Sequence, residues 1–329
     1  MKRKNVLIAV ATTVLLVAVA MGFYVDYLMN QVHYVDPETT PTLTQQELDS
    51  LLAEEIIPQA TTEPTVHGKK AYLPVVKEER VINILLIGQD RRAGETRARS
   101  DAMILCTFHT GSNTLTMTSF LRDLWVQIPG YGDNKLNAAY VAGGMKLLNE
   151  TLEKNFGVHI DGNVEVDFQQ FTQIIDMLGG IEIELRADEA KYLNRALNSK
   201  DLTSGVQTLN GQQALCYARI RSLDSDGDFS RTGRQRKVLE ALICKYRGAG
   251  VKTALTLLDD ILPMVTTDMT KVQIVGYCWD LLPMLSSMEI VSQRIPAEGT
   301  FTTPVIRNMS VLLADMDAAR KMLRHTLGS

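Results

Sequence analysis

Two charged segments of the sequence carry the side chains with the most evident chemistry. The first extends from Asp90 to Asp101 and contains four arginines, among them Arg92 and Arg99. It follows an apolar run, and in open α/β sheets ligands bind beyond the ends of buried strands. Asp101 directly precedes the apolar residues 102–105, so its carboxylate would lie at a sheet edge, where burial demands a partner. A solvated surface loop is the alternative interpretation of this segment.

The second charged segment begins at Arg219 and continues through Gln235. On a strand, Arg219 and Arg221 would project from one face and repel each other unless an anion lies between them. A phosphate or diphosphate suits this pair, because a guanidinium group binds phosphate oxygens bidentately. Arg231, Arg234 and Gln235 follow at the start of a predicted helix, where an anion would also meet free N–H groups. This pattern predicts a site for a phosphorylated ligand, with a solvated helix face as the alternative.

Other chemical signatures are weak. The 5 histidines are scattered, and the sequence contains no HExxH motif, no G-x-S-x-G elbow and no Walker loop. The acidic run 224–228 resembles a calcium loop, but Gln235 stands at its twelfth position, where the loop requires Glu. Asp228 remains a candidate partner for an arginine. Arg and Asp without His or Cys indicate substrate positioning and metal-assisted phosphoryl chemistry.

The composition is that of a folded protein without a general affinity for polyanions. The chain has 329 residues, of which 22% are charged and 45% hydrophobic, and its formal net charge is -4. Any anion site must therefore come from local clustering of basic residues, and nucleic acid is excluded as a partner. The cysteines at positions 106, 216, 244 and 278 lack metal-ligand spacing. We interpret them as buried thiols, with one disulfide as the alternative.

The N-terminal residues predict a membrane anchor. Residues 1–5 include three basic residues, and residues 6–25 include no charged residue. About 20 apolar residues in a helix span a bilayer core of roughly 30 Å, and a basic flank stays in the cytoplasm. We therefore expect a cytoplasmic tail at 1–5, a single transmembrane signal anchor at 6–25 and an extracytoplasmic remainder at the cell membrane. Ala18-Val19-Ala20 supports the alternative of a cleaved signal peptide.

The rest of the chain divides into a linker and one globular domain. Residues 26–80 are rich in Pro, Thr and Glu, which predicts an extracytoplasmic linker. Residues 81–329 interleave strand and helix patterns, which favours an α/β layered domain. The apolar run at 81–87 predicts a strand buried on both faces. The other predicted strands are 102–108, 114–120, 181–185 and 215–221, and the predicted helices are 137–156, 168–178, 232–247 and 311–327.

Several blocks of the sequence, in order and spacing, resemble the motifs of the LytR-CpsA-Psr family. The resemblance is dense from about Val81 to Arg247. Its mild departures are Leu121, where many members have Pro, and Ser230, where many have Gly. The blocks are Leu86–Arg92, Arg99–Asp101, Ser119–Asp123, Lys135–Tyr140 with Gly143-Gly144, Val166–Phe168 with Leu178–Gly180, Leu209–Gly211, Tyr217–Arg221 and Gly227–Gln235.

The resemblance implies a fold, a reaction and a cell envelope. The fold is a three-layer α-β-α sandwich around a mixed central sheet. The reaction transfers a glycopolymer phosphate (teichoic acid, capsule or a related polymer) from a polyprenyl diphosphate carrier to a peptidoglycan hydroxyl. The product is a phosphodiester, and Mg²⁺ assists, with Mn²⁺ as the alternative ion. The envelope is of the Gram-positive type.

The resemblance also implies roles for individual residues. Asp90 and Asp101 would hold the metal ion, and Arg99 and Arg122 would complete the catalytic group. Asp90, Asp101 or a metal-bound water would be the general base. The polyprenyl tail would enter a hydrophobic tunnel between the sheet and the helices. The diphosphate would be bound by Arg92, Lys135, Arg219, Arg221, Arg231, Arg234 and Gln235.

Two alternative functions fit the same residues. One is a polyprenyl-phosphate-binding regulatory membrane protein without catalysis. The other is a polyprenyl diphosphate hydrolase, in which water replaces the sugar hydroxyl. Two aspartates beside a full set of arginines favour catalysis, because binding alone would not need to orient a metal ion.

Overall fold

The computed structural model describes most of the predicted globular domain and a few residues that precede it. The described residues are 26–27, 30–36, 75, 77–90, 100–247 and 251–328. The predicted tail and anchor, residues 1–25, lie outside this part of the chain, as do Arg92 and Arg99 and most of the predicted linker. Among the described helices, none combines the length and the apolar character that crossing a bilayer requires.

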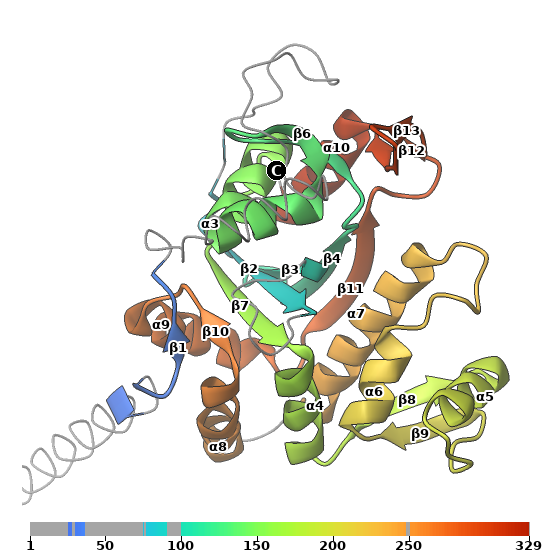
Figure 1. The fold of residues 1–329 in the computed structure, drawn as a ribbon. Coiled ribbons are helices and arrows are strands. Elements are labelled where there is room, and N and C mark those ends of the chain that lie inside the picture. The colour runs from blue at the N-terminus through green and yellow to red at the C-terminus, as the bar shows by residue number, and fades with distance from the viewer. Residues whose placement is uncertain are drawn as a thin grey trace, which may run out of the picture.

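A mixed sheet runs through the middle of the domain (Figure 1). Within the described residues it has seven strands, which lie in the spatial order β1 (His33–Tyr34), β10 (Thr266–Thr267), β7 (Gly162–Asp167), β2 (Val81–Gln89), β3 (Ser100–His109), β4 (Thr114–Phe120) and β11 (Glu289–Ile295). The pairs β2–β7, β4–β11 and β1–β10 are parallel, and the other pairs are antiparallel. β2 is central, which explains why its sequence is continuously apolar.

Helices pack on both faces of the sheet. On one face, α3 (Leu136–Phe156) and α10 (Met316–Leu327) enclose a core with Leu85 of β2 and Leu105 of β3. The adjacent side chains Ile84 and Leu86 project to the other face. That face is covered by α4 (Phe168–Met177), α7 (Asp228–Lys245), α8 (Val251–Ile261) and α9 (Lys271–Leu281). The predicted α/β fold with a mixed central sheet between helices is confirmed.

Smaller elements surround these layers. A lateral unit with its own core consists of β8 (Ile181–Leu185), α5 (Ala187–Ala196), β9 (Gly205–Leu209) and α6 (Gly211–Ala218). Three short antiparallel pairs are β5 (Trp125–Ile128) with β6 (Gly132–Lys135), β12 (Phe301–Thr302) with β15 (Leu313–Ala314), and β13 (Val305–Ile306) with β14 (Met309–Ser310). Two 3₁₀ turns, η1 (Leu262–Met264) and η2 (Leu282–Met284), follow α8 and α9.

The strand predicted at 215–221 is wrong. Residues 211–218 form α6, whose N-cap Asn210 accepts a hydrogen bond from the backbone N–H of Gln213, while the Gln213 side chain accepts one from the backbone N–H of Asn210. Such a reciprocal capping box starts a helix, and it outweighs the short alternating pattern that suggested a strand. The terminal helix is also shorter than predicted, because it begins at Met316, after the N-cap Asp315.

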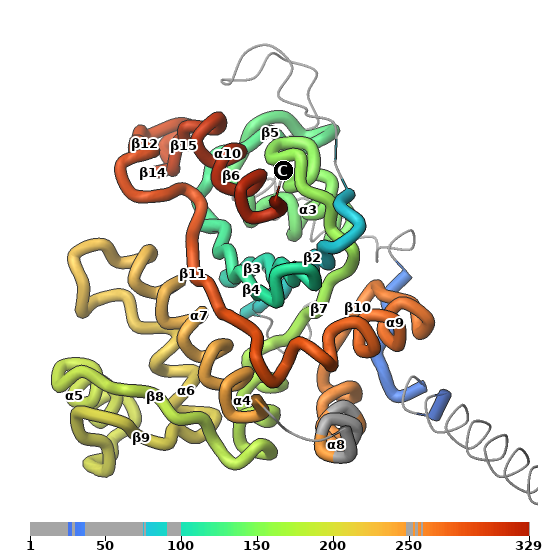
Figure 2. The backbone as a smooth tube through the Cα atoms, turned by 180° about the vertical axis from the view of Figure 1, so that it is seen from behind, coloured from blue at the N-terminus to red at the C-terminus, as the bar shows by residue number. Residues whose placement is uncertain are grey.

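Two further expectations need correction. The predicted linker contains β1, which pairs with β10 and forms one edge of the sheet beside α9 (Figure 2). Its first part is therefore built into the domain. The four cysteines are free, and Cys106 is buried on β3, but Cys244 is exposed. The interpretation of all of them as buried thiols is wrong for Cys244.

Candidate active site

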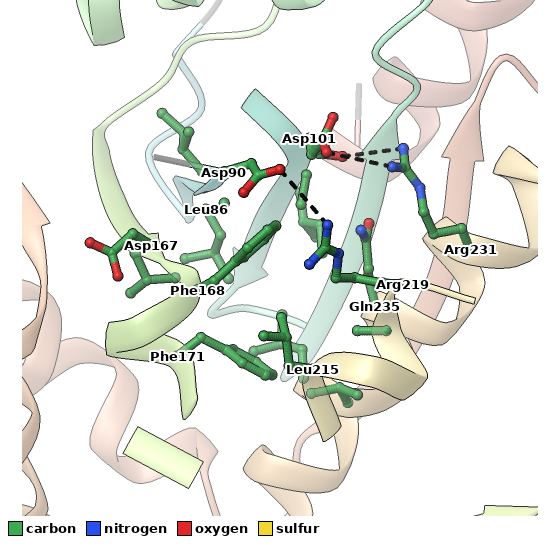
Figure 3. A pocket seen from close by; sticks show the side chains of 18 of the residues that line it. Leu86, Asp90, Asp101, Asp167, Phe168, Phe171, Leu215, Arg219, Arg231 and Gln235 are labelled. Atoms are coloured by element: carbon green, nitrogen blue, oxygen red, sulfur yellow. Dashed lines mark hydrogen bonds and ion pairs between the residues drawn. The ribbon is translucent and has the colours of Figure 1, made fainter. Parts of the chain in front are cut away.

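A cavity of about 850 Å³ lies between the sheet and the helices α4, α6 and α7. Its lining has two parts. Asp90, Asp101 and several arginines gather together, and in Figure 3 they lie above the apolar side chains of Phe171 and Leu215. Further apolar lining residues are Leu86, Val141, Val164, Val166, Phe168, Ile174, Val238, Leu239 and Leu242. A ligand matched to this cavity is anionic at one end and apolar at the other.

An irregularity in the sheet positions Asp101. β2 and β3 pair in regular antiparallel register as far as Gly88 and Ala102. The next pair joins Gln89 to Ser100, which leaves Asp101 without a partner on β2. Asp101 is therefore the extra residue of a β-bulge, a feature that re-aims a side chain beside a functional site.

The bulge changes the face to which this carboxylate points. Successive side chains on a strand alternate between faces. Ala102 and Ile104 line the cavity, and Met103 and Leu105 face the opposite core under α3. A regular strand would place Asp101 with Met103 and Leu105, yet Asp101 lines the cavity together with Ala102.

Arg122 holds Asp101 in place. Its Nη1 donates to Asp101 Oδ1 at 2.6 Å, from the turn that follows β4. Burial lowers the pKa of Arg122, but the carboxylates of Asp101, Asp228 and Asp123 outweigh this effect and raise it. The Nε of Arg122 is buried and makes no hydrogen bond within the described residues. Arg122 is thus a fixed cation with a donor still available to a ligand.

Asp90 and Arg219 approach the cavity from opposite sides. Asp90 follows the last residue of β2, and Arg219 is the C-cap of α6. Arg219 Nη2 lies 3.8 Å from Asp90 Oδ2, and both side chains are partly exposed (Figure 3). The Arg219 guanidinium also lies 4.4 Å above the ring of Phe168, which supports it through a cation–π contact. The fold therefore brings the predicted site residues Asp90 and Arg219 together.

Arg231 is the most deeply buried cation of the site. Only 2% of its side chain is exposed, and its Nη2 lies 2.8 Å from Asp228 Oδ1. The same nitrogen donates to the backbone carbonyl of Asp101 at 3.3 Å. Burial lowers the pKa of Arg231, and the neighbouring cations Arg122 and Arg221 lower it further. An anion bound among these guanidinium groups would relieve both unfavourable effects.

Arg221 and Gln235 complete the lining. Arg221 Nη2 lies 3.9 Å from Asp101 Oδ2, and its Nε lies 3.9 Å from Asp228 Oδ1. Gln235 follows Arg231 by one helical turn on α7, and its buried Oε1 has no hydrogen-bond partner in the described part of the chain. Because buried polar atoms are normally paired, this acceptor oxygen is one that a bound cation or a hydrogen-bond donor of a ligand would satisfy.

Two predicted ligand residues lie elsewhere. Lys135 does not line the cavity, and its Nζ lies 2.7 Å from Asp123 Oδ1. Arg234 is also turned away: its Nε donates to Glu189 Oε1 at 2.9 Å, and its Nη2 pairs with Asp224. The prediction that Arg234 binds the diphosphate is corrected on this ground. Glu189 is buried in the lateral unit, and a buried carboxylate without a paired cation is strongly destabilising. Arg234 therefore pairs with Glu189 and does not face the cavity.

The carboxylates of the site fit a divalent cation of the magnesium type. Asp90 and Asp101 line the same cavity, and among the described residues Asp101 Oδ2 has only ion-pair contacts, at 3.9 and 4.0 Å. Mg²⁺ takes one or two protein carboxylates and completes its shell with phosphate oxygens and water. No cluster of three or more potential ligands from His, Cys, Asp and Glu occurs among the described residues. The donor set thus suits an ion that arrives together with a phosphorylated substrate.

Sequence reasoning missed the aromatic part of the site. Phe168 supports Arg219, and Phe171 lines the apolar part on the next turn of α4. The signal that could have found them is the N-cap Asp167, whose side chain accepts from the Gln170 N–H and starts α4 at the cavity wall. Phe168 and Phe171 in the first turns of this helix therefore face the cavity at the end of β7.

The chain belongs to the LytR-CpsA-Psr family, because the LytR_cpsA_psr family model matches residues 49–326. Polyisoprenyl-teichoic acid--peptidoglycan teichoic acid transferase TagU of Bacillus mycoides is 32% identical over 229 residues, which cover 68% of this chain and 71% of that protein. Regulatory protein MsrR of Staphylococcus aureus (strain Mu50) is 37% identical over 169 residues, which cover 51% of this chain. That match spans 50% of the length of MsrR.

A solved structure agrees with the fold. The LytR-CPS2A-psr family protein YwtF (TagT) with bound octaprenyl pyrophosphate lipid superposes with a TM-score of 0.60 at 25% identity. The match covers 81% of this chain and 100% of that chain. The family predicted from the sequence motifs is therefore confirmed.

Proposed function

We propose that this protein transfers a glycopolymer phosphate from a polyprenyl diphosphate carrier to a hydroxyl of peptidoglycan. The observation that carries the proposal is the two-part cavity, in which charged groups adjoin an apolar lining. A polyprenyl diphosphate has the same two parts. The proposal is supported by the names of the relatives, since TagU is a teichoic acid transferase and TagT has been solved with octaprenyl pyrophosphate.

The arginines would bind the diphosphate of the carrier. Arg231 is buried, Arg122 is partly buried, and both are held by carboxylates. The Nε of each makes no hydrogen bond within the described residues. Arg219 and Arg221 are more exposed and adjust more easily to a ligand. Fixed donors aimed at the place where charge develops are the usual source of catalysis in phosphoryl transfer. The polyprenyl chain would lie along Phe171, Leu215 and the other apolar lining residues.

The reaction makes one phosphorus–oxygen bond and breaks another. The acceptor hydroxyl oxygen bonds to the phosphorus that carries the glycopolymer, and the bond to the bridging oxygen breaks. Polyprenyl phosphate leaves with the bridging oxygen, and its new charge is neutralised by the arginines. The proton of the hydroxyl passes to Asp90 or Asp101. When bound by these two aspartates, Mg²⁺ (or Mn²⁺) would supply further charge neutralisation on the phosphate oxygens.

The predicted anchor gives the reaction its location. A transmembrane segment at 6–25 with a cytoplasmic tail at 1–5 would hold the domain at the outer surface of the cell membrane. The lipid carrier and the peptidoglycan acceptor would both be accessible there. An intact N-terminus on the mature protein, read by mass spectrometry, would agree with the anchor, and a new N-terminus after Ala20 would contradict it.

The decisive experiment is a transfer assay with the full-length chain in lipid nanodiscs. The components are a polyprenyl diphosphate oligosaccharide, peptidoglycan fragments and Mg²⁺. We expect a phosphodiester product from the wild type and from the control variants Arg195→Ala and Asp201→Asn, which alter exposed residues of the lateral unit. We expect almost no product from Arg219→Ala or Asp101→Asn.

Other outcomes would indicate the alternative functions. Tight lipid binding without product in the wild type would contradict transfer and favour a regulatory role. Release of sugar phosphate at equal rates with and without peptidoglycan would favour the hydrolase. Omission of Mg²⁺ tests the metal, because unchanged turnover in chelator would contradict its part in the proposal.

A further inference from the structure

Helix α9 is apolar on two opposite sides. Its inner side packs on the sheet through Ile274 and Leu281. Val272, Val275 and Trp279 recur at helical spacing on the outer side, and 83%, 39% and 80% of these residues is exposed. A surface helix normally presents polar side chains to water, and a contiguous exposed apolar face marks an interaction site.

The N-terminal segment fixes where this apolar face lies. Lys271 is the first residue of α9, and its Nζ lies 3.2 Å from Oδ1 of Asp26. Asp26 is the first residue after the uncharged segment 6–25. Figures 1 and 2 both show β1 beside α9. The residue that follows the predicted anchor therefore adjoins the start of α9.

The length of α9 limits how far its apolar face can be from a bilayer. The helix has 11 residues, which at 1.5 Å per residue is about 16 Å. The headgroup layer on each side of the hydrocarbon core is about 5–8 Å thick. A helix that starts where the anchor leaves the bilayer, and that lies parallel to the membrane plane, therefore has its outer side in this layer. Trp and Tyr are enriched at that depth, and Tyr27 near the exit is 57% exposed.

The same helix adjoins the apolar part of the cavity. Leu86 and Val164 line the cavity and also belong to the core cluster that contains Ile274. Leu239 of the cavity wall packs in a cluster with Leu281. α9 and the cavity therefore share one face of the sheet, so a membrane against α9 would lie on the same side of the sheet as the cavity.

We propose that the outer side of α9, together with Tyr27, docks into the outer interface of the lipid bilayer. Docking gives the domain a second point of attachment besides the anchor, and so a defined orientation, with the sheet face that holds the cavity on the side of α9. The proposal rests on the membrane anchor of the proposed function. It adds a second membrane contact made by the folded domain.

Tryptophan fluorescence tests the docking directly in the full-length chain. The sequence has 2 tryptophans, none of them in residues 6–25, and Trp125 is fully buried. The chain is reconstituted into vesicles of phosphatidylcholine and phosphatidylglycerol, with or without bromine near the top of the acyl chains. The Trp279 signal is the difference between the wild type and Trp279→Phe. We expect it to fall by about twofold in brominated vesicles, because interfacial aromatic rings lie at the headgroup level.

A second variant and a flotation step keep the outcomes distinct. Val272→Asp changes an exposed residue, and we expect it to weaken the quenching while the chain still floats with the vesicles. A floating chain whose Trp279 signal is equal in both kinds of vesicle would overturn the docking and leave the anchor intact. Quenching replaced by a blue shift that grows with protein density would assign this face to a second copy of the chain, which also overturns it. A chain that fails to float contradicts the anchor itself.

Discussion

Arg234 provides the sharpest test of how the arginines are divided between structure and ligand binding. Its side chain and that of Glu189 are each 4% exposed, and they pair at 2.9 Å. In Arg234→Met, Glu189 would be buried without its principal cation. Removal of one partner of a buried ion pair costs about 3–5 kcal/mol. Glu189 still accepts a hydrogen bond from the backbone N–H of Arg186 at 3.0 Å, so we expect the lower end of this range.

The assay is equilibrium unfolding of the full-length chain in detergent, followed by circular dichroism. We expect Arg234→Met to lower the free energy of unfolding by about 3 kcal/mol. The double variant Glu189→Gln with Arg234→Met should regain most of this loss, because no uncompensated charge remains buried. The folded single variant should bind polyprenyl diphosphate as the wild type does. Unchanged stability together with weakened diphosphate binding would refute the reasoning and restore Arg234 to the ligand site.

Three further outcomes are expected. Phe168→Leu removes the ring under Arg219, and the loss of a cation–π contact of about 0.5–1 kcal/mol should weaken diphosphate binding roughly two- to fivefold in a calorimetric titration. Hydrogen bonds from Arg186 and Arg234 lower the pKa of Asp224, so the stability that this carboxylate contributes is present above its unfolded value of about 3.9 and is lost as the pH falls through its lower folded value. Unfolding followed from neutral pH down to about pH 2 should therefore show a shallower acid-side loss for Asp224→Asn. Burial raises the pKa of the Cys106 thiol to about 12, so a maleimide should label the exposed Cys244 in the native chain and Cys106 only after unfolding.

Each of these outcomes has a clear contrary. Equal weakening by Phe168→Leu and Phe168→Tyr would show that ring character under Arg219 is irrelevant. An acid-side slope unchanged by Asp224→Asn would mean that its ion pairs persist in the unfolded chain. Native-state labelling of Cys106 at the rate of Cys244 would contradict the burial of β3.

The sequence predicted the central elements well, because their patterns are local. The run at 81–87 is apolar since β2 is covered on both faces, and the helix at 137–156 ends at Gly157, whose positive φ of 74° suits glycine. The segment at 215–221 was misread because alternation over a few residues is weaker than the capping box at Asn210. The sheet edge at β1 depends on pairing with residues more than 200 positions away, which no local pattern encodes.

The site was predictable in its chemistry but not in its assignments. Asp90, Asp101, Arg219, Arg221 and Arg231 line one cavity, although they come from different parts of the chain. The motif spacing placed Arg234 with them, because helical periodicity puts it near Arg231. The choice between cavity and lateral unit depends on Glu189, which lies 45 residues earlier and is itself buried. Whether Arg234 pairs with Glu189 and Asp224 or faces the cavity depends on tertiary packing, which no local sequence pattern encodes.

The bulge at Asp101 makes the placement of this carboxylate in the cavity depend on residue count as well as residue type. Loss of Ser100 from the start of β3 would let Asp101 pair with Gln89 and would restore a regular ladder. Asp101 would then rotate to the face under α3, although no functional side chain had been substituted. Among members of this family, insertions and deletions should therefore be excluded at the start of β3. The register of β3 against β2 therefore decides whether Asp101 reaches the cavity.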